Sequence, residues 1–294
     1  MSGELGQPAL DGALIDAEYD PERRVGSRQP FIDWYVRHSA LARERLDCRL
    51  DVPYGPTPAE TLDLFPSSVP GSPLLLYIHG GYWRALSSKE FSFVANGLVP
   101  HGVTVAVMNY ALCPKVTIAD ITRQSHAAVA WLARNARQYS ADPGRLYVAG
   151  HSAGGQQVGM LLGGGGGPVG GSSAAGAGAG AGAISGGITI SGLFDLRPLR
   201  HSWLQPTLQL TEPACEDQSP LLHIPRQAPP LLVSVGSEES AAFIGQSQSY
   251  LAAWQAAGLG GRYYLQPGAN HYTAIYGLAD RASPLAQTLA QFLR

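Results

Sequence analysis

The chain has 294 residues, of which 45% are hydrophobic and 14% charged, and its formal net charge is −2. A chain of this length can bury a large core, and the near-neutral charge offers no basic face to nucleic acid or to an anionic membrane. No stretch reaches the ~20 consecutive apolar residues of a membrane span, and the first twenty residues do not resemble a signal peptide.

The three cysteines, Cys48, Cys113 and Cys215, are odd in number and widely spaced. This pattern predicts neither a disulfide framework nor a zinc site, and it favours a reducing compartment, which we take to be the cytoplasm.

The first third of the chain predicts an arm, a helix and a hairpin. Residues 1–20 are expected to form a loose N-terminal arm, and 31–45 have apolar residues at helical spacing. Residues 45–52 and 61–65 predict two strands joined by a proline- and glycine-rich turn, so an antiparallel hairpin is expected.

From residue 73 onward, predicted strands alternate with predicted helices. Apolar runs predict buried strands at 73–78, 103–108, 146–149, 187–190, 230–235 and 262–265. Helical spacing predicts helices at 89–99, 120–139, 243–257 and 284–293. This alternation predicts one α/β domain over residues 1–294, with a mostly parallel central sheet flanked by helices.

Two segments interrupt this alternation. Residues 163–183 are almost entirely Gly, Ala and Ser, so they are expected to form a flexible surface insertion within the domain. Residues 193–228 are irregular and rich in proline, and together with the N-terminal helix they are a candidate for a small lid over the functional site.

The sequence Gly-His-Ser-Ala-Gly at 150–154 follows a predicted strand and precedes a predicted helix. This G-x-S-x-G pattern is typical of a sharp turn that lifts the serine hydroxyl above the sheet edge. Ser152 is therefore the expected nucleophile. With the leading hairpin, this turn predicts an α/β-hydrolase arrangement.

A serine hydroxyl needs a base, and the base needs a carboxylate that orients it. His271 is the expected base, because it alone among the histidines follows the last predicted strand. The other candidates lie on helices, in turns or in the irregular region: His38, His79, His101, His126, His151, His201 and His223.

The carboxylate is expected after the strand at 230–235, where Glu238 and Glu239 are adjacent. Glu239 is preferred, partly from the resemblance described below. Asp195, one strand earlier, is a rival that we interpret instead as the cap of a helix.

An oxyanion intermediate needs converging backbone N–H groups. Ala153 follows the nucleophile, and the glycines of His-Gly-Gly-Tyr-Trp at 79–83 follow another buried strand. Gly80, Gly81 and Ala153 are therefore the expected oxyanion hole, and His79 is expected to brace the turn. Aromatic residues near these positions could form a substrate pocket: Tyr82, Trp83, Phe194, Trp203 and Tyr272.

Five motifs together resemble the arylformamidase (kynurenine formamidase) family and its esterase relatives. They are His79-Gly-Gly-Tyr-Trp83, Asn109-Tyr-Ala-Leu-Cys-Pro114, Gly150-His-Ser-Ala-Gly154, Ser191-Gly-Leu-Phe-Asp195 and Asn270-His-Tyr272. The resemblance extends from about Trp34 to the last residue. The family's acid precedes a Phe and a Gln-Ser pair, which here are Phe243 and Gln246-Ser247, and this indicates Glu239.

The resemblance implies hydrolysis of N-formyl-L-kynurenine to kynurenine and formate without a metal or cofactor. It also suggests Tyr82, Trp83 and Tyr272 as substrate-binding residues. A glutamate stands where some members have aspartate, and the insertion at 163–183 is unusual. The expected partner is a small-molecule substrate, with no nucleic acid or membrane, and a homodimer is left open.

Two other readings of the sequence remain. A general carboxylesterase for short acyl or aryl esters would use the same residues, because amides and esters share a tetrahedral oxyanion intermediate. A non-catalytic binding module would be expected to lack a triad member, and the sequence supplies all three.

Overall fold

The structure is a computed structural model, and it describes residues 11–163 and 184–294. The Gly/Ala-rich insertion predicted at 163–183 lies, except for Gly163, outside the described residues.

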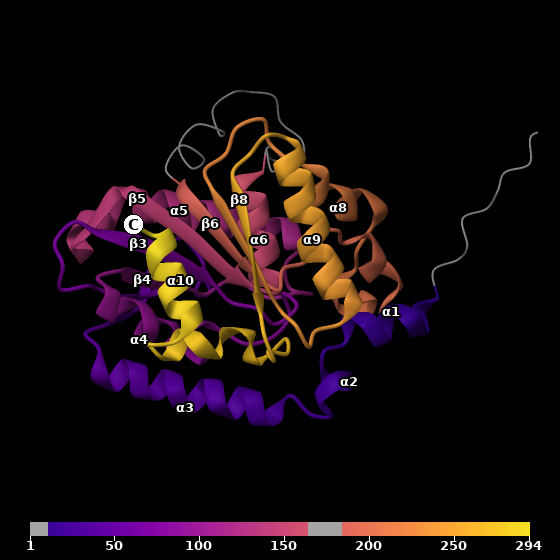
Figure 1. The fold of residues 1–294 in the computed structure, drawn as a ribbon, viewed down its shortest axis with the longest axis horizontal. Helices are drawn as coiled ribbons and strands as arrows, with labels where there is room; N and C mark the ends of the chain where they lie inside the picture. Colours follow the sequence, from indigo (N-terminus) through magenta and orange to yellow (C-terminus); the bar gives the residue numbers. More distant parts are fainter. Residues whose placement is uncertain (1–10, 164–183) are drawn as a thin grey trace, which may run out of the picture.

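Eight strands form one sheet in the order β1-β2-β4-β3-β5-β6-β7-β8 (Figure 1). They are β1 Arg49–Pro53, β2 Thr61–Phe65, β3 Ser72–Ile78, β4 Thr104–Met108, β5 Ala141–His151, β6 Ile184–Ile190, β7 Leu231–Gly236 and β8 Gly261–Gln266. β2 pairs antiparallel with β1 and β4, and the remaining neighbours are parallel, so the predicted hairpin and parallel sheet are confirmed.

The helices occupy the segments between and before these strands. They are α1 Gly12–Tyr19, α2 Glu22–Val25, α3 Gln29–Arg45, α4 Val94–Leu98, α5 Ile118–Asn135, α6 Ala153–Leu162, α7 Gln205–Leu208, α8 Glu212–Asp217, α9 Ala241–Ala256 and α10 Pro284–Phe292. No helix among the described residues is both long enough and apolar enough to cross a membrane.

The sheet carries a hydrophobic cluster on each face. All seven residues of β3 are buried, with Leu74 and Leu76 in one cluster and Leu75 and Tyr77 in the other. Residues of α5, α6 and α9 complete the first cluster, and residues of α3, α4 and α10 complete the second. Burial on both faces explains why the strand reads as an unbroken apolar run in the sequence.

The helix predicted at 89–99 is shorter than expected. A short 3₁₀ turn at Ser88–Glu90 precedes α4, which ends at Leu98. Gly97 lies against the carbonyl of Leu278, where an added Cβ would be only 2.5 Å from that oxygen. Pro100 has no N–H that could donate to the carbonyl of Asn96, so the α-helix gives way to the 3₁₀ turn Val99–His101.

The expectation of a loose arm over residues 1–20 is wrong for residues 11–20. Asp11 caps α1 by accepting a hydrogen bond from the N–H of Ala13 at 2.9 Å. Ile15 and Tyr19 are buried, and Tyr19 lies 5.9 Å from Phe243 of α9 between ring centroids. Tertiary packing therefore orders a segment whose own periodicity is weak.

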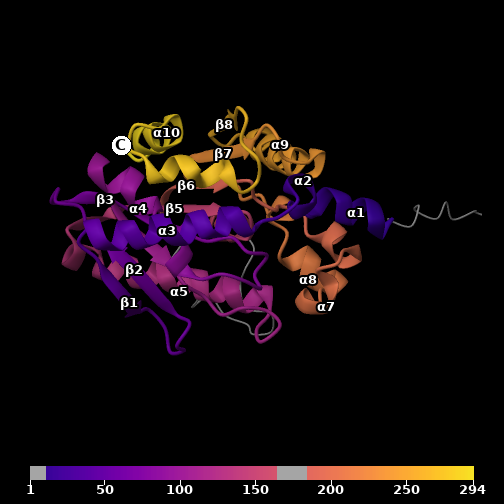
Figure 2. The same ribbon diagram turned by 90° about the horizontal axis from the view of Figure 1, so that it is seen from below.

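The N-terminal helices run along one edge of the sheet (Figure 1), and the view from below shows α3 crossing in front of it (Figure 2). The Tyr35 hydroxyl of α3 donates to the carbonyl of Tyr272 at 2.6 Å. α3 is thereby attached to the loop that follows β8, next to the predicted histidine base.

Candidate active site

Ser152 lies at the sharp turn between β5 and α6. Its backbone has φ 56° and ψ −117°, a conformation that an ordinary residue avoids. The residues two positions before and after Ser152 must be glycine: a Cβ on Gly150 would lie 2.2 Å from the Gly154 carbonyl oxygen, and one on Gly154 would lie 2.0 Å from that of Ile78. The predicted turn is therefore present in the structure.

Ser152, His271 and Glu239 form a continuous hydrogen-bonded chain. The Nε2 atom of His271 is 3.0 Å from Ser152 Oγ, and its Nδ1 atom is 2.6 Å from Glu239 Oε2. A carboxylate can only accept, so Nδ1 carries the proton and Nε2 of the neutral ring accepts from the serine hydroxyl. This is the tautomer in which the histidine can take the serine proton.

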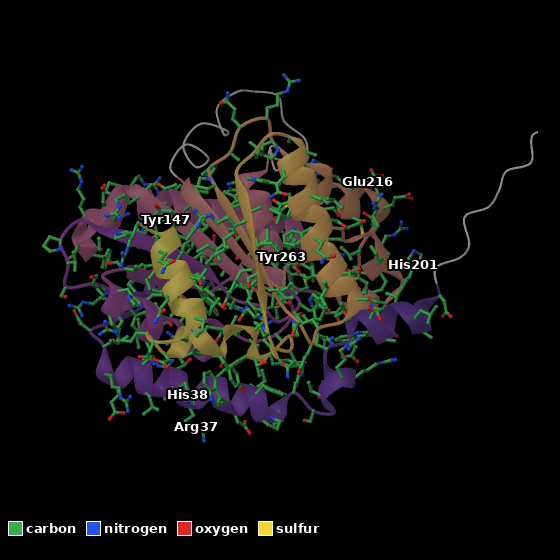
Figure 3. The ribbon with its side chains drawn as sticks, viewed as in Figure 1. Arg37, His38, Tyr147, His201, Glu216 and Tyr263 are labelled. Atoms are coloured by element: carbon green, nitrogen blue, oxygen red, sulfur yellow. The ribbon has the colours of Figure 1, made fainter. Side chains whose placement is uncertain are left out.

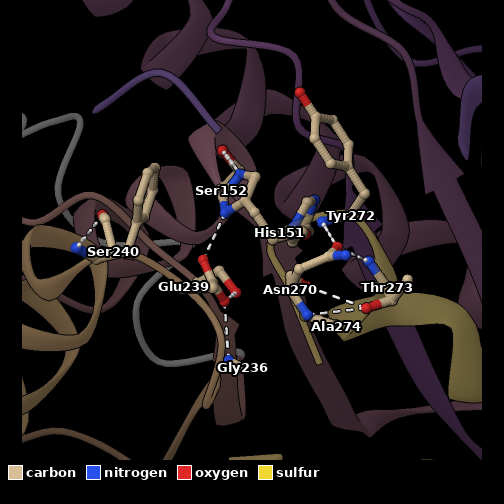
Figure 4. A network of polar contacts seen from close by, with 12 residues as sticks. His151, Ser152, Gly236, Glu239, Ser240, Asn270, Tyr272, Thr273 and Ala274 are labelled. Atoms are coloured by element: carbon tan, nitrogen blue, oxygen red, sulfur yellow. Dashed lines mark hydrogen bonds and ion pairs between the residues drawn. The ribbon is translucent and has the colours of Figure 1, made fainter. Parts of the chain in front are cut away.

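The carboxylate of Glu239 is fully buried and has three donors. Besides His271, the N–H of Gly236 donates to Oε1 at 2.8 Å and the hydroxyl of Ser191 donates to Oε1 at 2.5 Å. These contacts fix both carboxylate oxygens, and Figure 4 shows this network from close by. In the sequence, Ser191 was notable only as part of a family motif. Its hydrogen bond to Glu239 is known only from the structure.

The two rival carboxylates lie elsewhere. Glu238 is exposed, and Asp195 forms an ion pair of 2.7 Å with Arg197. Asp195 also accepts from the N–H of Arg197 at 3.0 Å, but the N-cap of the 3₁₀ turn Arg197–His201 is Leu196, so the interpretation of Asp195 as the cap residue of a helix is wrong. Of the three candidates, only Glu239 contacts His271.

Two further histidines, His151 and His79, form hydrogen bonds with backbone carbonyls around the site. His151 donates from Nε2 to the carbonyl of His271 at 2.9 Å, and burial, helped by the nearby His271, holds the pKa of His151 well below its usual value. His79 donates from Nδ1 to the carbonyl of Gly80 at 2.7 Å, and burial lowers the pKa of His79 to about 4. Both rings are therefore neutral and hold the loops on either side of Ser152.

The remaining histidines are not part of this hydrogen-bonded chain of side chains. Figure 3 labels two of them at the periphery of the molecule: His38 on α3, and His201 close to α1. His38 bonds with the carbonyl of Trp34 of its own helix at 2.8 Å.

The glycines predicted for the oxyanion hole lie against the serine. A Cβ on Gly80 would be 3.1 Å from Cβ of Ser152. Gly81 has φ 113°, and a Cβ there would lie 2.2 Å from the Ala85 carbonyl oxygen, so this turn requires glycine. Ala153 is the first residue of α6, where a backbone N–H has no partner within the helix.

A cavity of about 170 Å³ opens over Ser152. Gly80, Gly81, His151 and His271 line it together with Ser152. The other walls come from Tyr82, Arg84, Ala85, Leu86 and Phe91, from Trp203 and Tyr272, and from the N-terminal residues Asp20, Pro21, Glu22, Arg28, Gln29, Ile32 and Tyr35. The predicted pocket residues Tyr82, Trp203 and Tyr272 thus reach the cavity.

Trp83 and Phe194 do not line this cavity, so their expected place in the pocket is wrong. Trp83 is fully buried, and its indole N–H donates to Oε1 of Gln156 at 3.1 Å. Phe194 stacks on Tyr250 with ring centroids 4.1 Å apart. A tripeptide of glycine, tyrosine and tryptophan does not reveal which ring faces the cavity, and both Tyr82 and Trp83 have a positive φ, 50° and 55°.

Residues between Asp20 and Tyr35, including the start of α3, form one wall of the cavity. From the sequence, the N-terminal helix and residues 193–228 were a candidate lid over the site, and Trp203 of the latter segment also lines the cavity. The individual wall residues were not identified, because they lie more than a hundred positions before Ser152. Among the described residues, no group of three or more His, Cys, Asp and Glu side chains is arranged to hold a metal ion.

Comparison with known proteins agrees with this geometry. The family model BD-FAE matches residues 62–165. Kynurenine formamidase of Danio rerio is 30% identical over 259 residues, covering 86% of this chain and 84% of the relative. Esterase LipQ of Mycobacterium tuberculosis is 25% identical and covers 83% of this chain and 61% of its own length.

Among solved structures, a predicted thioesterase from Silicibacter sp. TM1040 superposes with a TM-score of 0.80 at 29% identity, covering 93% of this chain and 97% of that chain. The sheet order, the serine turn and the similarity to the Danio rerio enzyme over most of both chains lead to one conclusion. The chain belongs to the kynurenine formamidase family of serine hydrolases, which have the α/β-hydrolase fold.

Proposed function

We propose that this enzyme hydrolyses N-formyl-L-kynurenine to L-kynurenine and formate through a formyl-enzyme intermediate. The observation that carries the proposal is the Ser152–His271–Glu239 chain, which ends on the floor of the cavity beside Gly80 and Gly81. The similarity to kynurenine formamidase of Danio rerio supports the choice of substrate.

In the first half-reaction, Ser152 Oγ attacks the formyl carbon while His271 Nε2 takes the hydroxyl proton. The carbonyl electron pair moves to oxygen, and the N–H groups of Gly80, Gly81 and Ala153 hold that oxyanion. The C–N bond then breaks as His271 returns its proton to the departing aryl nitrogen. An aryl amine leaves more readily than an alkyl amine because its nitrogen is less basic.

In the second half-reaction, a water molecule attacks the formyl ester on Ser152 while His271 takes one of its protons. The tetrahedral intermediate collapses, formate leaves, and the proton returns to Ser152 Oγ. Glu239 keeps the imidazole oriented in both halves and stabilises the imidazolium that forms. The reaction needs only water as co-reactant.

A second candidate is a carboxylesterase for short acyl or aryl esters. Its support is the similarity to esterase LipQ, together with a triad and oxyanion hole that treat esters and amides alike. Since Trp83 lies outside the cavity, a limit on acyl size cannot be ascribed to its ring.

The test is a steady-state comparison of N-formyl-L-kynurenine with p-nitrophenyl acetate, with Ser152→Ala as the background. We expect the larger kcat/KM for the formamide, and a preference for formyl over acetyl and propionyl groups on the same aryl amine. Negligible turnover of the formamide beside fast ester cleavage would support the carboxylesterase instead.

A further inference from the structure

The cavity over Ser152 has charged side chains in its lining. Ser152, His151 and His271 are buried, whereas four charged residues of the lining are half-buried or exposed: Asp20, Glu22, Arg28 and Arg84. Charged groups beside a reactive serine are suited to a substrate that itself carries charge.

Arg84 and Arg28, the two arginines that line the cavity, differ in their surroundings. It is half-buried, and its guanidinium carbon lies 5.1 Å from the ring centroid of Trp203. In the part of the chain that the structure describes, arginine ion pairs involve other residues and none involves Arg84. Arg28, by contrast, is exposed and lies 3.8 Å from the carboxylate of Glu22.

The backbone also fixes the position of Arg84. Its N–H donates to the carbonyl of Gly81 at 3.1 Å, so Arg84 belongs to the same turn as the expected oxyanion donors. Trp203 in turn packs edge-on against Tyr82, with centroids 5.9 Å apart. A guanidinium that rests on an aromatic face has lost part of its hydration and side-chain freedom, while the donors at its edge remain available.

The guanidinium group matches the geometry of a carboxylate, to which it can donate two parallel hydrogen bonds. A formyl group contributes only one hydrogen beyond the carbonyl, so most of the cavity is left for the leaving group. Its aryl ring has aromatic neighbours in Tyr82 and Trp203.

We propose that Arg84 binds a carboxylate carried by the leaving group of the substrate, and so selects aryl formamides that carry a carboxylate over those that lack one. This inference rests on the proposed function and deepens it: it assigns recognition of the amino-acid end to Arg84. Arg84 is thus a binding residue that determines specificity, and the bond-breaking steps do not pass through it.

The test uses a matched pair of substrates, N-formyl-L-kynurenine and 2-formamidoacetophenone, which is the same aryl formamide without the amino-acid group. Removing a charge-assisted hydrogen bond costs enough to reduce binding about 10- to 100-fold. We expect Arg84→Leu to lower kcat/KM for N-formyl-L-kynurenine by that factor, mainly through KM, and to affect 2-formamidoacetophenone, which has no carboxylate, far less. Arg84→Lys keeps the positive charge but loses the two parallel donors of the guanidinium group, so it should retain an intermediate preference for N-formyl-L-kynurenine.

Arg28→Leu is the matched control, because Arg28 lines the same cavity but is paired with Glu22. It should change the ratio of kcat/KM between the two substrates less than threefold. An equal loss on both substrates in Arg84→Leu would show that Arg84 only supports the turn, and an unchanged ratio would show that it does not contact the carboxylate. Either result would overturn the inference.

A second pair of substrates tests the role of Arg84 even if the proposed formamidase activity is absent. If the wild-type enzyme cleaves neither formamide, 4-acetoxybenzoate and phenyl acetate take their place, since their leaving groups differ by one carboxylate. A preference for the anionic ester that Arg84→Leu abolishes would support Arg84 binding while the formamidase proposal fails. Equal use of both esters by the wild-type enzyme would overturn the role of Arg84.

Discussion

At the scale of single residues, the backbone of Ser152 is held in a conformation that costs about 1–3 kcal/mol. Its φ of 56° is maintained because Gly150 and Gly154 allow α6 to approach the strand ends more closely than any side chain would permit. The result is a hydroxyl that reaches both His271 and the cavity. The unfavourable backbone is thus compensated by packing around it.

Ser152→Ala should lower kcat by about 10⁴- to 10⁶-fold on every substrate, because the hydroxyl is the proposed nucleophile. The far-UV circular dichroism and the thermal midpoint should stay close to those of the wild type, since one buried oxygen is lost without a cavity. Activity within tenfold of the wild type would contradict a mechanism through this serine.

His271→Ala should be about as damaging as the serine variant, because the two residues act as one unit. Glu239→Gln should be milder, at about 10⁴-fold or less in kcat, since the amide keeps the shape but not the charge. Glu238→Gln and Asp195→Asn are the controls, because the first side chain is exposed and the second pairs with Arg197. If either control loses activity while Glu239→Gln keeps it, the acid is misassigned.

Gln156 connects Trp83 to the helix that follows the serine. It is fully buried, accepts from Trp83 Nε1 at 3.1 Å and from Gln157 Nε2 at 2.8 Å, and donates to the carbonyl of Gln218 at 2.8 Å. Gln156→Leu should remove all three hydrogen bonds and lower the free energy of unfolding by about 1–3 kcal/mol per unsatisfied group. It should also lower kcat, because Trp83 adjoins the oxyanion turn.

Urea unfolding and steady-state kinetics check this expectation. Gln255→Leu is the control: Gln255 is exposed and bonds only with the carbonyl of Gly261, at 3.1 Å. A Gln156→Leu enzyme that is destabilised but keeps the wild-type kcat would show that the hydrogen bond between Gln156 and Trp83 stabilises the fold but does not position the oxyanion turn.

At the scale of elements, α1 shows how a short helix can depend on distant partners. Besides the contacts of Tyr19, Glu18 accepts from the N–H of Ala242 at 2.8 Å, at the start of α9, and Asp16 accepts from the N–H of Trp203 at 2.7 Å. Its eight residues are too few for a stable isolated helix. α1 therefore exists because α9 and the 193–228 segment hold it, and it helps to position the cavity wall that follows it.

Tyr19→Ala should lower the free energy of unfolding by about 3–5 kcal/mol, the range for removing a large buried aromatic side chain. Leu14→Ala on the same helix should change it by less than about 0.5 kcal/mol, since Leu14 is 67% exposed. Denaturant unfolding of both variants measures the difference. Equal, small effects would mean that α1 contributes little to stability.

At the scale of the whole molecule, α6 and β6, which flank the Gly/Ala-rich sequence, contact each other directly. A Cβ on Gly187 of β6 would lie 2.3 Å from Leu162 of α6, so the two elements are packed directly together. Loop-closure entropy rises only slowly with length. Replacing residues 164–183 by a six-residue Gly-Ser linker should therefore shift Tm by no more than about 3 °C.

Differential scanning calorimetry measures that shift. A loss of more than about 10 °C would indicate that residues 164–183 make stabilising contacts, against the interpretation from composition. The same variant assayed on N-formyl-L-kynurenine shows whether the segment affects substrate entry.

The sequence by itself determined the elements of this protein and the approximate place of its site. β2 was predicted at its observed bounds, and β3, β4 and β7 within a residue or so, because strands buried on both faces have continuous apolar runs between turn residues. Ser152 and His271 could be selected because each follows a parallel strand, and the carboxyl ends of parallel strands meet at one edge. Local pattern and topology suffice for such inferences.

Tertiary structure decided what depends on side-chain direction and on contacts between distant segments. Glu238 and Glu239 are adjacent in the sequence, but only the second faces His271, and only the packed loop shows this. Likewise, the sequence placed Trp83 beside the substrate, whereas Gln156 holds it in the core, and Arg84 beyond it reaches the cavity. The residues 20–35 become a cavity wall only because α1 and α3 find partners more than two hundred residues away, as Tyr35 does in Tyr272.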